Sequence, residues 1–108
     1  MTFQEVSQMV GSIGLPFAYY QFPDSTPQTL PFICFIYDYD DVYADNSNYV
    51  GRVVLNIELY TENKDFDMEN TVETVLRSHG MSWAKESTYI DSEQMQMTNY
   101  SMGVIINA

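Results

Sequence analysis

Apolar and polar residues alternate most clearly between residues 49 and 60. Every second residue in the middle of this stretch is aliphatic: Val53, Leu55, Ile57 and Leu59. The residues between them are of mixed character, namely Val54, Asn56, Glu58 and Tyr60. Because successive side chains of a strand point to opposite sides, this pattern predicts a strand with one face in the core. What the second, mixed face contacts is the functional question.

Two amphipathic helices are predicted, one near the start of the chain and one after residue 65. The first has a capping box formed by Thr2 and Glu5, and it is expected to stop at Gly14. Its apolar residues recur at helical intervals: Phe3, Val6, Met9, Val10 and Ile13. A helix of about three turns is not stable alone in water, so we expect its apolar face to lie on a sheet.

The second helix is predicted to begin at Asp65, a good N-cap residue, and to end at Gly80. Acidic residues in its first turn and Arg77 in its last turn complement the helix dipole. Its buried face is predicted to contain Met68, Val72, Val75, Leu76 and His79. Glu69 and Glu73 are predicted to form a solvated pair on the opposite side.

Four further stretches rich in β-forming residues predict strands. They cover residues 15–22, 32–37, 81–87 and 95–106. The run at 32–37 is continuously apolar, which is typical of a strand covered on both faces. Residues 38–48 join it to the strand at 49–60 as an antiparallel hairpin. The sequence therefore predicts one α+β domain over residues 1–108, with the order α-β-β-β-α-β-β and a mainly antiparallel sheet of four to five strands packed against two helices.

The chain is strongly acidic. Fifteen acidic residues stand against four basic ones, which gives a formal net charge of −11. A field of this sign repels DNA phosphates, so specific nucleic-acid binding is not expected. The one cysteine, Cys34, cannot form an internal disulfide and lies in an apolar run, which indicates a buried thiol in a reducing compartment. No basic segment or long apolar run follows Met1, so we expect neither a secretion signal nor a membrane span.

The sequence contains no clear catalytic, cofactor-binding or metal-ligating pattern. The one histidine, His79, has no second histidine or nearby cysteine with which to share a metal ion. The aspartates between residues 38 and 45 could share a calcium ion, but the glycine and the twelfth-position glutamate of an EF-hand loop are missing. The serines lack a nucleophile-elbow motif. We therefore expect no cofactor, no metal ion and no enzymatic activity.

Three long stretches, from about residue 13 to residue 102, carry a resemblance to a known family. They are GLPFAYYQFPDSTPQTLPFICFIYDYDDVYADNSNYV, LNIELYTENKDFDMENTVETVL and WAKESTYIDSEQMQMTNYSM. Together they resemble the small tail-terminator or tail-completion proteins of long-tailed phages of Gram-positive bacteria. The resemblance implies a structural protein of the virion, located at the top of the tail. It implies a homo-hexameric ring that caps the tail tube, with sheets around a central channel and helices outside.

Such a ring would contact the tail tube protein on one side and the head-tail connector or stopper protein on the other, with DNA only as passing cargo. The long loops at 23–31 and 38–48 are predicted to form these contacts or those between subunits, because long loops on small scaffolds usually carry function. Candidate interface residues are Asp24, Thr26, Gln28, Asp38, Asp40, Asp41, Tyr43, Asp45 and Tyr60. Asn56 and Glu58 are candidates for lining the channel.

Two alternative functions remain open on the sequence alone. Another small ring or adaptor protein of the phage neck would share these features. An acidic DNA mimic that inhibits a host DNA-binding protein would instead present carboxylates as phosphate surrogates: Asp38, Asp40, Asp41, Asp45, Glu62, Asp65, Asp67 and Glu69. A mimic should be a monomer or dimer, whereas a ring subunit should be a hexamer in the tail.

Overall fold

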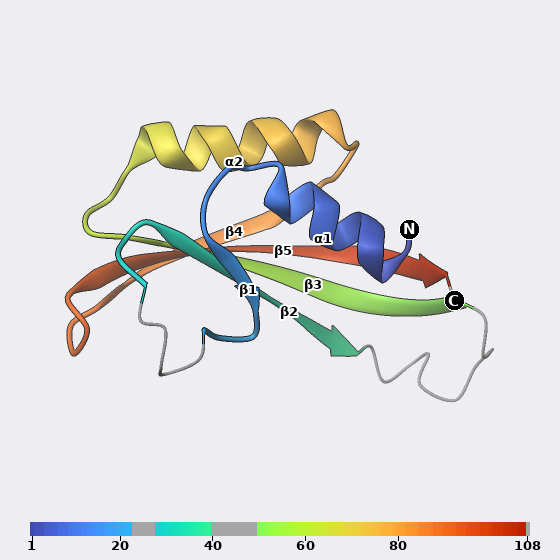
Figure 1. Cartoon of the computed structure of the whole chain (residues 1–108), viewed down its shortest axis with the longest axis horizontal. Helices are drawn as coiled ribbons and strands as arrows, with labels where there is room; N and C mark the ends of the chain where they lie inside the picture. Colours follow the sequence, from blue (N-terminus) through green and yellow to red (C-terminus); the bar gives the residue numbers. More distant parts are fainter. Residues whose placement is uncertain (23–27, 40–49, 108) are drawn as a thin grey trace.

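The computed structural model of the chain describes residues 1–22, 28–39 and 50–107. It confirms the α+β class and the predicted order of elements (Figure 1). The elements are α1 (Phe3–Gly11), β1 (Phe17–Tyr19), β2 (Phe32–Tyr39), β3 (Val50–Thr61), α2 (Phe66–Ser78), β4 (Ala84–Ile90) and β5 (Met95–Asn107). The long strand at the centre of the sequence pattern is β3.

The five strands form one sheet in the order β1-β2-β3-β5-β4. β1 runs parallel to β2, and every other neighbouring pair is antiparallel. The predicted pairing of β2 with β3 is confirmed, since Phe32 lies opposite Tyr60 and Tyr39 lies opposite Val53. The final strand, β5, is inserted between β3 and β4, so β3 has long partners on both sides.

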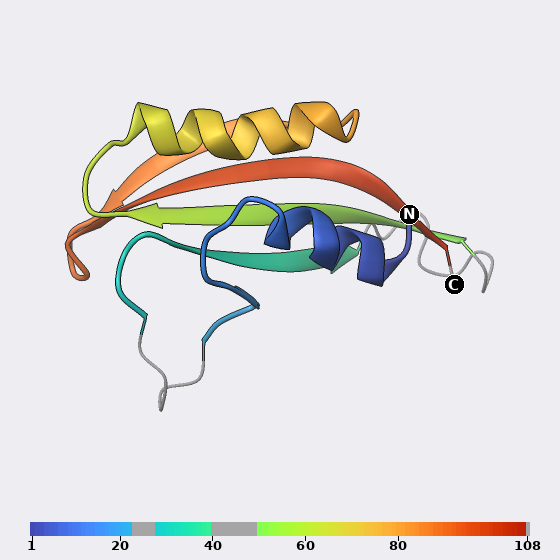
Figure 2. The same ribbon diagram turned by 45° about the horizontal axis from the view of Figure 1, so that its top comes forward.

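Both helices lie on the same face of the sheet (Figures 1 and 2). The four aliphatic residues of β3 point to this face, as predicted, and none is more than 1% exposed. They pack with residues of both helices and of β5, including Val6, Met9, Val10, Val72, Leu76, Tyr100 and Met102. Burying each such aliphatic side chain contributes roughly 1.5 to 3 kcal/mol. The strand is therefore fixed in register, because a shift by one residue would expose the whole set.

The predicted helix signals are also confirmed. The Thr2 side chain accepts a hydrogen bond from the backbone N–H of Glu5, and the Glu5 carboxylate accepts one from the backbone N–H of Thr2. The Asp65 carboxylate caps α2 by accepting from the backbone N–H of Met68 at 2.9 Å. Gly14 and Gly80 have φ angles of 92° and 73°, which glycine adopts without a Cβ penalty.

Replacing Asp65 by alanine should lower the free energy of unfolding by about 1 kcal/mol, the usual cost of losing an N-cap side chain. Urea unfolding followed by circular dichroism would measure it. Asp67→Ala is the matched control, because it removes a carboxylate from the same turn without removing the cap. Equal losses in both variants would show that the helix dipole, and not the cap bond, carries the effect.

Two residues assigned to buried helix faces are exposed instead. Phe3 is 49% exposed, because it is the first residue of α1 and its ring packs edge-on against Tyr37 at 5.0 Å, at the margin of the sheet. His79 is exposed because it caps the end of α2, where its Nδ1 lies 2.9 Å from the carbonyl oxygen of Val75. Neither side chain therefore contributes to the core in the predicted way.

Three strand predictions need correction. β1 covers only 17–19 of the predicted 15–22, and β4 covers 84–90 instead of 81–87. The second shift arises because the backbone N–H of Met81 closes the end of α2 by donating to the carbonyl of Leu76 at 3.0 Å. β2 is not covered on both faces: both helices lie on one side, so Phe32 and Ile36 on the other side remain partly exposed.

Candidate functional site

The sheet face opposite the helices, which we call the open face, is the main candidate site. The pairing register places the following side chains on it: Phe32, Cys34, Ile36 and Asp38 from β2, Arg52, Val54, Asn56, Glu58 and Tyr60 from β3, Met95, Met97, Asn99, Ser101 and Ile105 from β5, and Ala84, Glu86, Thr88 and Ile90 from β4. Neither helix lies over this face (Figure 2). It differs from the helix-covered face by containing charges, amides and aromatic rings side by side.

The middle of the open face is a shallow acidic hollow of about 380 Å³. Its carboxylates come from three strands: Asp38 from β2, Glu58 from β3 and Glu86 from β4. We call these three residues the acidic centre. They are spread too widely for one cation to bind them directly, since no three His, Cys, Asp or Glu side chains in the described parts of the chain could hold a metal ion together. The hollow is therefore a wet, negatively charged surface.

A chain of amide hydrogen bonds runs across the acidic centre. Asn56 Nδ2 donates to Asp38 Oδ2 at 2.7 Å, and Asn99 Nδ2 donates to Asn56 Oδ1 at 3.1 Å. Asn99 Oδ1 is buried and accepts no hydrogen bond from the described residues. The chain joins β2, β3 and β5 side by side and holds the polar groups in fixed positions.

One end of the open face forms a second hollow of about 600 Å³, which we call the aromatic pocket. Its apolar walls are Tyr20, Phe22, Phe32, Cys34, Tyr60, Ile90 and Met95. Phe32 stacks on Tyr60 with 5.0 Å between ring centroids, and Phe22 meets Phe32 edge-on at 5.5 Å. Polar side chains of Gln21, Gln28 and Glu93 complete the lining.

Two titratable groups of the aromatic pocket are held in their neutral forms. Burial and the neighbouring Glu58 carboxylate raise the pKa of Tyr60, whose hydroxyl donates to Glu58 Oε1 at 3.0 Å. Burial, followed by Glu58, also raises the pKa of the Cys34 thiol. A thiol with a raised pKa is a poor nucleophile, so Cys34 acts as a wall of the pocket. The predicted burial of Cys34 is confirmed, at 5% exposed.

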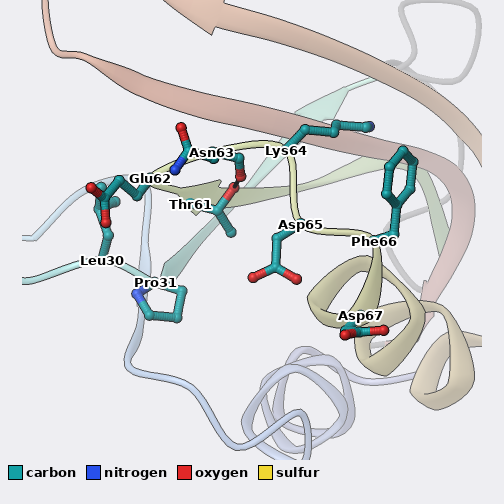
Figure 3. Close-up of a pocket in the computed structure, with 9 residues that line it drawn as sticks. All are labelled: Leu30, Pro31, Thr61, Glu62, Asn63, Lys64, Asp65, Phe66 and Asp67. Atoms are coloured by element: carbon teal, nitrogen blue, oxygen red, sulfur yellow. Dashed lines mark hydrogen bonds between the residues drawn. The ribbon is translucent and has the colours of Figure 1, made fainter.

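A third hollow, of about 560 Å³, lies where β3 leads into α2 (Figure 3). Residues 61–67 line it together with Leu30 and Pro31. Its polar groups already have structural roles, because Asp65 caps α2 and the Thr61 hydroxyl donates to the carbonyl of Asn63 at 2.7 Å. Phe66 stands at its edge and is 72% exposed. No histidine or cysteine is among the lining residues, and the hollow offers no activated nucleophile.

A buried polar cluster that sequence reasoning missed lies beneath α2. Glu69 is only 2% exposed, and its two carboxylate oxygens lie 2.9 Å from Lys64 Nζ and 2.7 Å from Lys85 Nζ. Lys85 also pairs with Glu73 at 2.7 Å, and the Tyr100 hydroxyl donates to Glu73 at 2.8 Å. The prediction that Glu69 and Glu73 form a solvated pair is therefore wrong. A signal was present, since Glu69 precedes the buried Val72 by three residues and so shares its side of the helix.

The ion pairs overcome the cost of burying these carboxylates. Burial raises the pKa of Glu69, but the hydrogen bonds and charges of Lys85 and Lys64 outweigh it and leave the pKa below its ordinary value. Glu73 behaves in the same way, with Lys85 and the Tyr100 hydroxyl opposing burial to lower its pKa. The pKa of Lys85 is raised, chiefly by its hydrogen bonds to Glu69 and Glu73. The cluster is thus fully ionised near neutral pH and fastens α2 to β4 and β5.

The described members of the predicted site fall into two places. Asp38, Asn56 and Glu58 come together in the acidic centre, whereas Gln28 and Tyr60 line the aromatic pocket. Sequence reasoning missed three residues of these hollows, Glu86, Glu93 and Asn99, whose positions depend on the pairing of β5 with β3 and β4. The remaining predicted interface residues lie outside the described parts of the chain: Asp24, Thr26, Asp40, Asp41, Tyr43 and Asp45.

Two broader findings complete the description of the site. Neither α1 nor α2, the helices of the described residues, has the length and apolar composition needed to cross a membrane. Comparison of the chain with models of protein families, with curated proteins and with solved structures found no match in any of the three.

Proposed function

We propose that the chain is a structural subunit of a phage tail-terminator ring, which caps the tail tube and joins it to the head connector around a channel for DNA. The proposal starts from the resemblance of the sequence to that family. It assigns the chain to the top of the tail in the virion, as a homo-hexamer between the tube protein and the connector or stopper protein. The chain has no catalytic role in this proposal.

The open face is the observation that supports the proposal most strongly. A small domain that leaves one whole sheet face uncovered needs either a partner or an aqueous environment for it. The acidic centre, with the amides of Asn56 and Asn99, suits water better than a dry protein interface. Facing a channel, these carboxylates would repel DNA phosphates and let DNA slide without sticking.

Contacts between subunits are assigned to the edges of the sheet and to the predicted loops. β1 and β4 are the two edge strands, and each has one side without a partner strand among the described residues. The aromatic pocket lies at one end of the open face and contains two predicted interface residues, Gln28 and Tyr60. The loops at 23–31 and 38–48 keep their proposed role in contacts with neighbouring subunits or the next ring.

The alternative of an acidic DNA mimic is less well supported. Two of the eight proposed phosphate surrogates are engaged inside the chain, because Glu69 is paired with lysines and Asp65 caps α2. Asp38 is held by Asn56. A mimic needs an exposed array of carboxylates, and these contacts reduce the available one. Another ring protein of the neck would fit the open face equally well and remains the alternative within the same class.

Immunoelectron microscopy of purified phage particles would test the proposed location. Antibodies raised against the chain should label the junction of head and tail in intact particles. A mimic acts on a host protein and should be absent from purified particles. Labelling elsewhere on the particle, or its absence after partial opening of the neck, would contradict the proposal.

A further inference from the structure

We propose that the aromatic pocket is a docking site for an arginine side chain of a different protein. This inference deepens the proposed function, because it names the chemistry of the partner that would meet the ring at this end of the open face. Binding itself can be tested on the isolated chain. The outcome is therefore separable from the question of whether the chain forms a ring.

The walls of the pocket suit a flat cation on an apolar stem. Three ring contacts are available at Phe22, Phe32 and Tyr60, whose mutual stacking holds their faces in place. An arginine buries its methylene stem against apolar walls and stacks its planar guanidinium on aromatic faces. Aromatic and arginine residues are also the groups most enriched in the buried parts of protein interfaces. The hollow of about 600 Å³ is large enough to take one such side chain with its backbone at the rim.

The charge around the pocket selects a cation over a neutral aromatic side chain. Glu93 is part of the lining, and Glu58 stands behind the Tyr60 hydroxyl that it accepts from. No basic residue is among the described residues that line the pocket. The net charge of −11 adds a long-range attraction for cations. A guanidinium at the rim would thus meet a carboxylate and aromatic faces together, a combination that strengthens cation–π contacts.

The arginine is assigned to another protein because the four bases of this chain are engaged within it. Lys64 and Lys85 are paired with Glu69, and Lys85 also with Glu73. The Arg77 guanidinium lies over the ring of Trp83 at 5.8 Å from its centroid. Arg52 also interacts within the chain. Docking of a second copy would have to break one of these contacts.

The mouth of the pocket is held in a fixed shape by the backbone. The two non-glycine residues with positive φ in the described chain are Tyr20 at 70° and Gln94 at 51°, and both lie at this pocket: Tyr20 lines it and Gln94 stands between Glu93 and Met95. The backbone N–H of Tyr20 donates to the carbonyl of Phe35 at 2.8 Å, which keeps this turn against β2. A preformed site loses less entropy on binding.

Titration of the isolated, isotopically labelled chain with the peptide acetyl-Gly-Arg-Gly-amide, followed by NMR, would test the inference. We expect saturable shifts centred on Tyr20, Phe32, Tyr60 and Glu93 at 150 mM salt. The matched citrulline peptide, which has nearly the same shape without the charge, should bind at least threefold more weakly. A tyrosine peptide should likewise give weaker or no localised shifts.

Variants of the chain make the test specific to the pocket. Glu93→Gln should weaken the arginine peptide about threefold, the effect of losing one exposed charge pair, while Glu62→Gln makes the same charge change outside the pocket and should not. Tyr20→Asn removes a ring and keeps a residue that tolerates positive φ, so it should also weaken binding. Tyr89→Asn is its control, because Tyr89 is also half-exposed but lies on the other face of β4.

Several outcomes would overturn the inference. Shifts spread evenly over the acidic surface, or equal weakening by Glu62→Gln, would show general attraction of cations. Equal binding of the citrulline or tyrosine peptide would show an apolar site. Concentration-dependent self-association through the pocket would assign it to a second copy. None of these results would bear on whether the chain is found at the neck of the particle.

Discussion

Particles carrying Asn56→Lys together with Glu58→Lys are expected to assemble and then to eject their DNA slowly. Both side chains belong to the open face, where Asn56 bonds to Asp38 and Glu58 belongs to the acidic centre. In a hexamer the two substitutions would place twelve lysines around the proposed channel. Passing phosphates would then meet a collar of cations in place of a like-charged wall. Ejection rates from single particles or from bulk fluorescence would measure the effect.

The salt dependence of that defect gives it a distinctive signature. If six of the lysines contact phosphates, their affinity for DNA should fall by about a thousandfold between 50 and 200 mM salt. The delay should therefore be large at low salt and small at high salt. Glu62→Lys with Asn63→Lys is the matched control, because it makes the same charge change outside the open face. Equal rates in mutant and parent at both salt concentrations would remove the open face from the channel.

Glu69→Ala should destabilise the fold more than any other single exposed or polar substitution considered above. The loss of a buried partner leaves Lys64 and Lys85 without their main counter-charge, and breaking buried pairs typically costs 3 to 5 kcal/mol. Both lysines are about one-third exposed, so water can partly replace the carboxylate. We therefore expect a loss of about 3 kcal/mol, at the lower end of that range. Urea unfolding would measure it, with Glu62→Ala as a surface control that should change little.

The stabilisation by this cluster should disappear in acid. The pKa of Glu69 and of Glu73 is lowered in the folded chain from an ordinary value of 4.5. A lowered pKa means that the stabilising contribution is complete above about pH 4.5 and is lost as the pH falls through the folded value. The raised pKa of Lys85 gives the opposite limit, with stability lost as the pH rises through that value. A difference between parent and Glu69→Ala that stayed constant from pH 7 to pH 3 would contradict the proposed ion pairs.

Much of the fold could be predicted because its signals are local. Alternation in β3 identified which side chains face the core, and the cap residues Thr2 and Asp65 marked the two helix starts. Such signals depend on residues within a few positions of one another, which a sequence displays directly. The element order and the α+β class followed from them.

The parts that sequence reasoning missed depend on partners distant along the chain. Glu69 is buried because Lys85, sixteen residues later, reaches it from the inward face of β4. Glu86 and Asn99 join the acidic centre because β5 is inserted between β3 and β4, an order that the alternation of each strand does not reveal. Asn56 and Glu58 could be assigned to the open face from their own strand alone, but their neighbours on that face could not.

A cryo-electron microscopy reconstruction of the tail top is the most direct test of the central claim. The account predicts a ring of six copies in which the open face points toward the axis, with Asp38, Glu58 and Glu86 lining the channel and α1 and α2 on the outside. A reconstruction with the open face buried against a neighbouring protein, with the helices lining the channel, or with no density for the chain at the neck would contradict it.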